Sequence, residues 1–217
     1  MPPTTYLTRH PSAGLLFVQL LGVLLYPWME GTALGRTLFG AFGLVVLGLA
    51  LHVVKRSPIQ SWVAVLLALL VLTLSAVDML LPSPRLDWLI ALVEAAFYFY
   101  AAASLIAYMT ADQHATTDEL YAVGATFTLL AWAFAYLFSV CQLLLPGSFV
   151  AMIEPQAMRT WMELLFLSFT TLSGVGLGDI VPITPMARAL VMIEEFAGVM
   201  YLALVVSRLI ALSVNKR

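Results

Sequence analysis

Six long hydrophobic stretches, separated mostly by short polar turns, make up most of the chain. They are Gly14–Met29, Leu34–Val54, Ile59–Leu81, Leu86–Met109, Leu120–Leu145 and Pro185–Leu212. Each is close to or above the ~20 residues that a helix needs to cross a bilayer. Connections of a few residues are typical of helical hairpins and leave no room for a soluble domain between them. The pattern therefore predicts an all-α membrane protein with six transmembrane helices.

A seventh hydrophobic segment, Trp161–Phe169, is too short to span a bilayer. It leads into the run Thr-Thr-Leu-Ser-Gly-Val-Gly-Leu-Gly-Asp, residues 170–179. Glycine adopts backbone angles that other residues avoid, so such a run can stay extended with its carbonyls turned to one side. Non-helical backbone at membrane depth persists only where it is buried in protein or lines a cavity. Because a ring of carbonyls can replace the hydration shell of a cation, this pattern predicts a re-entrant element that contacts ions.

The composition agrees with the hydrophobic pattern. Of 217 residues, 62% are hydrophobic and 10% are charged, and the mean hydropathy is +0.99, which excludes an ordinary soluble domain. The net charge of −2 and the lack of blocks of like charge indicate no nucleic-acid partner. The single cysteine, Cys141, excludes an intrachain disulfide framework.

Residues Ser168–Arg188 read Ser-Phe-Thr-Thr-Leu-Ser-Gly-Val-Gly-Leu-Gly-Asp-Ile-Val-Pro-Ile-Thr-Pro-Met-Ala-Arg. This stretch resembles the pore of the tetrameric potassium-channel superfamily, whose filter reads Thr-Val-Gly-Tyr-Gly-Asp. The resemblance extends over Leu120–Leu212. It implies an outer helix, a pore helix from about Gln156 or Ala157 to Thr171, a selectivity filter and an inner helix. It also implies a homotetramer, in which three identical subunits complete the pore.

The resemblance assigns roles to individual residues. The filter and ion-binding residues are Ser173, Gly174, Val175, Gly176, Leu177 and Gly178. Potassium, as permeant ion and not as cofactor, would bind the backbone carbonyls of Gly174, Val175, Gly176 and Leu177. Filter support is expected from Thr170, Thr171 and Asp179. The hinge and apolar gate of the inner helix would comprise Gly198, Val205, Val206, Leu209 and Leu212.

Two departures from the family pattern bear on selectivity. Gly174 replaces a threonine whose hydroxyl helps form the innermost ion site. Leu177 replaces a tyrosine, and Phe166 and Leu167 replace the pore-helix aromatic residues that often hold this tyrosine. We expect a potassium-preferring channel, and a non-selective monovalent cation channel is the alternative.

The first four helices resemble the sensor domain of voltage-gated channels, but the fourth lacks the sensor charges. Leu86–Met109 contains no arginine or lysine, and Arg85 stands at its edge. Each charge that crosses the membrane contributes about 2.3 kcal/mol per 100 mV, so we expect no steep voltage gating. The expected organisation is a cytoplasmic lead (1–13), a four-helix sensor-like domain (14–111), an intracellular linker (112–119) and a pore domain (120–217).

The orientation follows from the basic residues near the helix ends. Lys55-Arg56 and Lys216-Arg217 fall on one side if all six segments span, which places both termini in the cytoplasm. The resemblance to small bacterial channels, whose filter enters from outside, implies the same orientation in a bacterial inner membrane. Lipids and the other subunits are the expected partners. A separate regulatory subunit stays an open alternative, because no segment of this sequence is expected to form a large cytosolic domain.

The hydrophobic segments contain the acidic residues Asp78, Glu94, Glu194 and Glu195 beyond their first turns. Charges at membrane depth are costly and are usually paired or functional. Arg159 and Arg188 are the expected partners of Glu194 and Glu195. For Glu94, a hydrogen-bonded structural carboxyl is favoured over a protonatable sensor.

An intramembrane enzyme is the least supported alternative. Ser173 beside Gly174 faintly resembles the serine of rhomboid-like proteases, but that chemistry requires a general base next to the serine. The three histidines fall at predicted cytoplasmic ends, away from this depth. We therefore expect no enzymatic activity and no cofactor.

Overall fold

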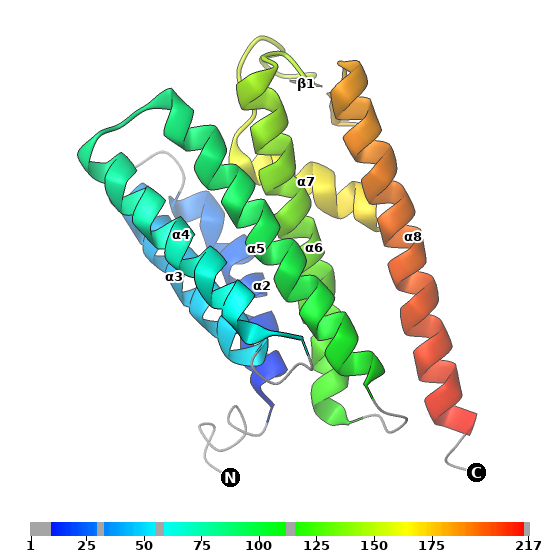
Figure 1. Cartoon of the computed structure of the whole chain (residues 1–217). Helices are drawn as coiled ribbons and strands as arrows, with labels where there is room; N and C mark the ends of the chain where they lie inside the picture. Colours follow the sequence, from blue (N-terminus) through cyan, green and yellow to red (C-terminus); the bar gives the residue numbers. More distant parts are fainter. Residues whose placement is uncertain (1–9, 30–32, 55–58, 112–115, 215–217) are drawn as a thin grey trace. The chain divides into compact units, whose positions relative to one another are not determined.

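The computed structural model describes residues 10–29, 33–54, 59–111 and 116–214, with side chains described except at 29, 33–41 and 209–214. The helices are α2 (Pro11–Met29), α3 (Ala33–Val54), α4 (Ser61–Leu80), α5 (Pro84–Thr110), α6 (Thr117–Leu144), α7 (Trp161–Leu172) and α8 (Pro185–Val214). Two short strands, β1 (Phe149–Ala151) and β2 (Ile180–Pro182), complete the described elements (Figure 1).

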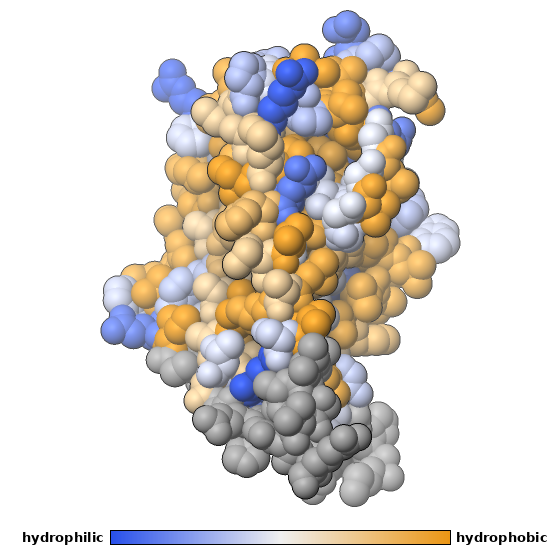
Figure 2. Space-filling view, turned by 90° about the vertical axis from the view of Figure 1, so that its right-hand side faces the viewer, coloured by the Kyte–Doolittle hydropathy of each residue, from blue (hydrophilic) through white to orange (hydrophobic). Residues whose placement is uncertain are grey.

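Five of the described helices are long and apolar enough to cross a membrane, namely α2, α4, α5, α6 and α8. Helix α3 has 22 residues, of which Phe42–Val54 form the apolar part with described side chains. Hydrophobic residues cover most of the face shown in Figure 2. The chain is therefore an all-α integral membrane protein, as predicted, and a sixth span through α3 stays a prediction.

The predicted start of the pore helix is wrong. Helix α7 begins at Trp161 and not near residue 156 or 157, because Thr160 caps it. The Thr160 hydroxyl accepts from the backbone N–H of Glu163 at 3.3 Å, and the Glu163 carboxylate accepts from the N–H of Thr160 at 2.6 Å. This reciprocal pair satisfies two N–H groups at the start of the helix. The motif Thr-x-x-Glu is visible in the sequence and would have located this start.

The chain divides into two compact units, and α4, α5 and α6 each contribute to both. The first unit comprises residues 1–68 and 99–129, and the second comprises 69–98 and 130–217. In the first unit, α2 packs on the beginning of α6. The backbone N–H and hydroxyl of Ser12 donate to the Asp118 carboxylate at 3.1 and 2.9 Å, and the Thr128 hydroxyl donates to Gln19 at 2.7 Å. Residue numbers rise together along both helices, so α2 and this part of α6 run parallel.

In the second unit, an aromatic cluster lies at the start of α7. The ring of Trp161 lies 5.2 Å from that of Trp132 and 5.5 Å from that of Tyr136, between ring centroids. Tyr98 stacks on Tyr136 at 5.6 Å. Aromatic pairs at these distances contribute beyond the area they bury. The cluster therefore holds the first turn of α7 against α5 and α6.

Helix α8 presents one buried stripe to the rest of its unit. The stripe recurs at alternating spacings of four and three residues and consists of Ala187, Val191, Glu194, Gly198, Tyr201 and Val205. This spacing keeps the residues on one helical face. The remaining apolar residues of α8 are largely exposed in the single chain, and Phe196 is 68% exposed. One face of α8 thus packs within the chain, and the others are left for lipid or a second subunit.

Candidate functional site

The glycine run after α7 is anchored through its backbone N–H groups. The carbonyl of Thr170 accepts from the N–H of Val175 at 3.0 Å and from the N–H of Gly176 at 2.9 Å. The Ser173 hydroxyl donates to the same carbonyl at 3.2 Å. The last carbonyls of a helix lack partners within the helix. Here the following segment supplies those partners, so the end of α7 and the glycine run form one hydrogen-bonded unit.

Each glycine of the run adopts a left-handed backbone conformation. The φ angles are 74° at Gly174, 57° at Gly176 and 71° at Gly178. No atom lies within 4 Å of the position that a Cβ would take at any of the three. The need for glycine is therefore conformational and not steric in the single chain, because L side chains disfavour positive φ. Every second residue of the strand must accept this conformation.

The carbonyls of this strand meet no donor in the part of the chain that the structure describes. Among the described residues, no hydrogen bond uses a carbonyl of Gly174–Gly178 as acceptor. The side chains of Val175 and Leu177 are each 63% exposed in the single chain. The first three N–H groups of the strand thus bond to α7, while its carbonyls meet no donor among the described residues, which suits a ligand that carries positive charge.

A two-stranded ribbon holds the C-terminal end of the strand. Asp179 is exposed and directly precedes β2, which pairs antiparallel with β1 so that Val181 lies opposite Val150. The hydroxyls of Ser148 and Thr184 lie 3.0 Å apart and join the same two segments. The strand is therefore fixed by α7 at one end and by the ribbon at the other. Elements of three residues leave no readable periodicity, so the sequence did not predict this ribbon.

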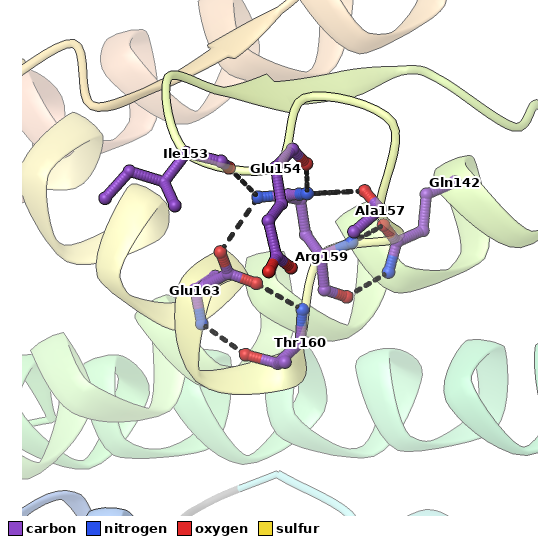
Figure 3. A network of polar contacts seen from close by, with 7 residues as sticks. All are labelled: Gln142, Ile153, Glu154, Ala157, Arg159, Thr160 and Glu163. Atoms are coloured by element: carbon purple, nitrogen blue, oxygen red, sulfur yellow. Dashed lines mark hydrogen bonds and ion pairs between the residues drawn. The ribbon is translucent and has the colours of Figure 1, made fainter.

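The loop before α7 is organised around a buried cation (Figure 3). The Arg159 side chain is 2% exposed and pairs with Glu163 at 3.0 Å. Its guanidinium also donates to the carbonyls of Ile153 at 3.4 Å, Glu154 at 2.6 Å and Ala157 at 2.5 and 3.1 Å. The planar fork of arginine suits several acceptors at once. These bonds replace the secondary structure that the loop lacks.

The same loop is tied to α6 by a side-chain amide. Gln142 donates to the carbonyl of Arg159 at 2.9 Å and accepts from its N–H at 3.1 Å. Both residues are buried. The pair mimics a strand-like backbone exchange between residues 17 positions apart. It connects the end of α6 with the residue that immediately precedes the cap of α7.

Glu194 does not bind the basic residues expected from the sequence. Its carboxyl group contacts the hydroxyl of Ser168 on α7, and that hydroxyl also donates to the carbonyl of Ala131 at 2.8 Å. Arg159 pairs with Glu163, and Arg188 donates to a backbone carbonyl of β2 at 3.2 Å. The expected ion pair at Glu194 is therefore wrong within the described residues. Glu195 is exposed in the single chain.

Gly198 lies where α8 touches the end of α7. A Cβ on Gly198 would lie 2.8 Å from the carbonyl carbon of Leu172 and 3.0 Å from its Cα. Both distances are too short for a side chain next to fixed backbone. Close packing therefore explains this glycine without a hinge, and the hinge stays a prediction.

The expected gate residues occupy different faces of α8. Val205 belongs to the buried stripe, and Val206 is 53% exposed. The side chains of Leu209 and Leu212 lie outside the described residues. An apolar constriction formed by these residues stays a prediction.

Asp78 and Glu94 share a pocket of about 380 Å³ in the second unit with a third acidic residue, Asp87. Its lining consists of Ser75, Asp78, Asp87, Ile90, Ala91, Glu94, Tyr136, Ser139 and Leu143. Glu94 forms a side-chain hydrogen bond with Tyr136, and Asp78 accepts from the backbone N–H of Ser83 at 3.3 Å. Glu94 is thus hydrogen-bonded, and its role as a structural carboxyl instead of a protonatable sensor stays a prediction. The described residues contain no group of His, Cys, Asp and Glu that could hold a metal ion.

A short helix between two long apolar helices, followed by an extended strand with free carbonyls, defines a pore-forming membrane protein. A protein-family model described as "Ion channel" matches residues 88–214, which is more than half of the chain. The chain belongs to this ion-channel family, within the potassium-channel-like superfamily, and is not an enzyme. Comparisons with curated proteins and with solved structures find no match.

Proposed function

We propose that four copies of this chain form a potassium-preferring channel that conducts passively through the Ser173–Gly178 filter. The observation that carries this proposal is the hydrogen bonding of the strand. The N–H groups of Gly174, Val175 and Gly176 bond to the end of α7, the three glycines have positive φ, and no described donor bonds to the carbonyls of Gly174–Gly178. A row of free carbonyls at membrane depth can replace the water around a cation.

The charges near the strand favour cations over anions. The C-terminal end of α7 carries a partial negative charge from its aligned peptide dipoles, and the strand begins at this end. Asp179 adds a carboxylate directly after the strand and is exposed. No lysine or arginine occurs in residues 160–187. An anion would therefore meet unfavourable charge along the whole segment.

The incomplete ion site and the exposed apolar surface of a single chain support a tetramer. A single chain supplies one carbonyl row, and coordination of an ion by a ring requires several such rows. Apolar residues of α8 such as Met192, Phe196 and Val199 are exposed in the single chain. Channels of this family generally form oligomers. Identical subunits around a closed axis would bring the rows together and cover part of this surface.

The parallel packing of α2 and α6 supports six spans, which leave both termini on the same side of the membrane. The basic pairs Lys55-Arg56 and Lys216-Arg217 favour the cytoplasm as that side. Three helices separate α2 from α6 in the chain. Two helices so separated run parallel when each of the three between them crosses the membrane, α3 included. The absence of arginine and lysine from residues 86–109 supports weak voltage dependence. We assign the channel to a bacterial inner membrane on its resemblance to small bacterial channels.

A non-selective cation channel on the same fold is the second candidate. Gly174 offers no hydroxyl for an innermost ion site, and Leu177 offers none to bond behind the filter. Phe166, on the adjacent helix, is 40% exposed and likewise offers no hydrogen-bonding group. A filter held by backbone bonds and apolar packing is freer to adapt to ions of another size.

Reversal potentials decide between the two candidates. Purified protein is reconstituted in planar bilayers with potassium on one side and sodium on the other, with empty bilayers as the control. A reversal potential near the potassium equilibrium value supports the first candidate, and a value near zero supports the second. A reversal potential that follows chloride, or no current under any condition, would reject both. Replacing Leu177 with tyrosine should shift the reversal potential toward the potassium value if the lost hydroxyl weakens selectivity.

A further inference from the structure

A fully buried carboxyl group lies behind the filter. Glu194 is 0% exposed, and one of its oxygens contacts the hydroxyl of Ser168. Its other oxygen, Oε2, is buried and has no hydrogen-bond partner among the described residues. A charged carboxylate left without a cation in such a place is strongly disfavoured. The family match and the proposed conduction path do not account for an acid at this position.

The single hydroxyl hydrogen of Ser168 constrains the protonation state of Glu194. The Ser168 hydroxyl contacts both the carbonyl of Ala131 and the carboxyl of Glu194. A serine hydroxyl carries one hydrogen, and a backbone carbonyl can only accept. Both contacts are hydrogen bonds at the same time only if Glu194 is protonated, donates to Ser168, and Ser168 donates to Ala131.

This chain of bonds joins three helices directly before the filter. Ala131 is on α6, Ser168 on α7 and Glu194 on α8. One turn further along both α7 and α8, Gly198 abuts the backbone of Leu172. The two contacts fix α8 against the last turn of α7. That turn includes Thr170, whose carbonyl holds the filter N–H groups.

We infer that Glu194 is a positioning residue of the filter, which acts as a protonated hydrogen-bond donor to Ser168 and thereby fixes the end of α7 between α6 and α8. This inference rests on the proposed function for its effect on conduction. The proton on the Glu194 carboxyl group is therefore required for the hydrogen bonds that join the three helices. Loss of that proton would place a negative charge in a buried site and remove one bond of the chain.

The charged groups on the surrounding elements offer Glu194 no compensating cation. On α8, Glu195 is adjacent and acidic, Arg188 donates to the carbonyl of Pro182, and Arg208 lies about 21 Å further along the helix at 1.5 Å per residue. On α7 the charged residue is Glu163, which pairs with Arg159. The part of α6 in this unit, residues 130–144, contains no charged residue. Asp179 precedes β2 and is also acidic. Each of these groups disfavours a charged Glu194 or leaves it unaffected.

Infrared difference spectroscopy tests the proton without any need for conduction. The spectrum of purified wild type minus that of Glu194→Gln at neutral pH should contain a carboxylic-acid C=O band, which disappears in the variant. The same subtraction with Glu195→Gln, an exposed neighbour, should contain carboxylate bands. Carboxylate bands in place of the acid band for Glu194→Gln would overturn the inference.

Amide hydrogen exchange tests the positioning role, also without conduction. Glu194→Leu should raise exchange at the N–H groups of Val175 and Gly176 about tenfold, because it removes a buried hydrogen bond. Glu194→Gln keeps a neutral donor and should stay within about twofold of wild type. Ser168→Ala should match Glu194→Leu, and the double variant should add nothing further. Equal exchange in Gln and Leu variants would overturn the inference.

Bilayer currents connect this role with the proposed function. Alkaline pH removes the proton, so wild-type open probability should fall at high pH, and Glu194→Gln should lose this dependence. Glu195→Gln, at an exposed neighbouring position, should retain it. A wild type without current but with the acid band and the exchange pattern would reject the proposed function alone. A conducting wild type whose pH dependence survives in Glu194→Gln would reject the regulatory consequence of the inference.

Discussion

Two irregular segments of the second unit flank α7 and differ in the partners of their backbone carbonyls. In the loop before α7, the carbonyls of Ile153, Glu154 and Ala157 surround the buried guanidinium of Arg159. In the strand after α7, the carbonyls of Gly174–Gly178 meet no donor among the described residues. One row of carbonyls binds a cation that belongs to the chain, and the other is open to a cation from solution.

The difference shows how one physical requirement can give a structural element before α7 and, in the channel that we propose, a conducting element after it. Buried carbonyls need a partner, because an unsatisfied polar group at membrane depth is costly. A resident arginine satisfies the loop permanently and makes it rigid. The strand obtains its rigidity from N–H bonds to Thr170, so its carbonyls can bind and release an ion without loss of structure.

The strongest test of this contrast is a side chain at a positive φ in the strand. Gly176→Val should abolish conduction, because a β-branched residue disfavours the φ of 57° at this position. Bilayer current and ion flux into liposomes measure the effect. Gly48→Ala is the matched control, since Gly48 lies in α3, has no positive φ, and has no atom within 4 Å of its Cβ position. Unchanged current in Gly176→Val would remove the filter assignment.

In the loop before α7, removal of the buried Arg159 guanidinium should have the largest effect on the free energy of unfolding. Arg159→Leu leaves buried carbonyls and Glu163 unpaired, so the free energy of unfolding should fall by about 3–5 kcal/mol. Thermal or denaturant unfolding in detergent measures this loss. Arg188→Leu, which removes an exposed guanidinium with one carbonyl bond, should change stability by about 0.5 kcal/mol. Equal losses in the two variants would contradict the central role of Arg159.

A substitution at Gly198, where α8 contacts the end of α7, distinguishes a packing role of this glycine from a hinge role. Gly198→Ala places a methyl group against the backbone of Leu172 and should destabilise the protein by about 1–3 kcal/mol. Unfolding in detergent and single-channel recording measure stability and conduction. Gly43→Ala, with open space around its Cβ position, is the control. If Gly198 serves only as a hinge, Gly198→Ala would retain wild-type stability and alter opening alone.

The cap of α7 should give the smallest effect. Thr160→Ala removes the hydroxyl that accepts from Glu163 and should lower the free energy of unfolding by about 1 kcal/mol. Thr160→Ser retains this bond and should stay close to wild type. Thr73→Ala, which removes an exposed hydroxyl bonded to a carbonyl of its own helix, is the matched control. A loss as large as that of Arg159→Leu would show that the cap and the buried cation act as one unit.

Several features of the site were readable from the chain. The glycines of the strand were recognisable because a positive φ angle favours glycine at each position where it occurs. The start of α7 was equally readable from Thr160 and Glu163, and the misplaced prediction overlooked this motif. By contrast, Ser168 and Glu194 are 26 residues apart, and neither residue type points to the other. The expected pairing of Glu194 with Arg159 or Arg188 failed because opposite charge alone does not specify proximity.

By itself, the sequence determined the membrane class, the approximate positions of the apolar helices and the site of the glycine strand. These properties depend on local quantities, namely hydrophobic length and the conformations that each residue allows. The tertiary structure alone decided which carbonyls Arg159 binds, why Gly198 carries no side chain, and how Glu194 is accommodated. Those outcomes depend on groups brought together from distant positions, because burial forces each polar atom to find a partner wherever the packing supplies one.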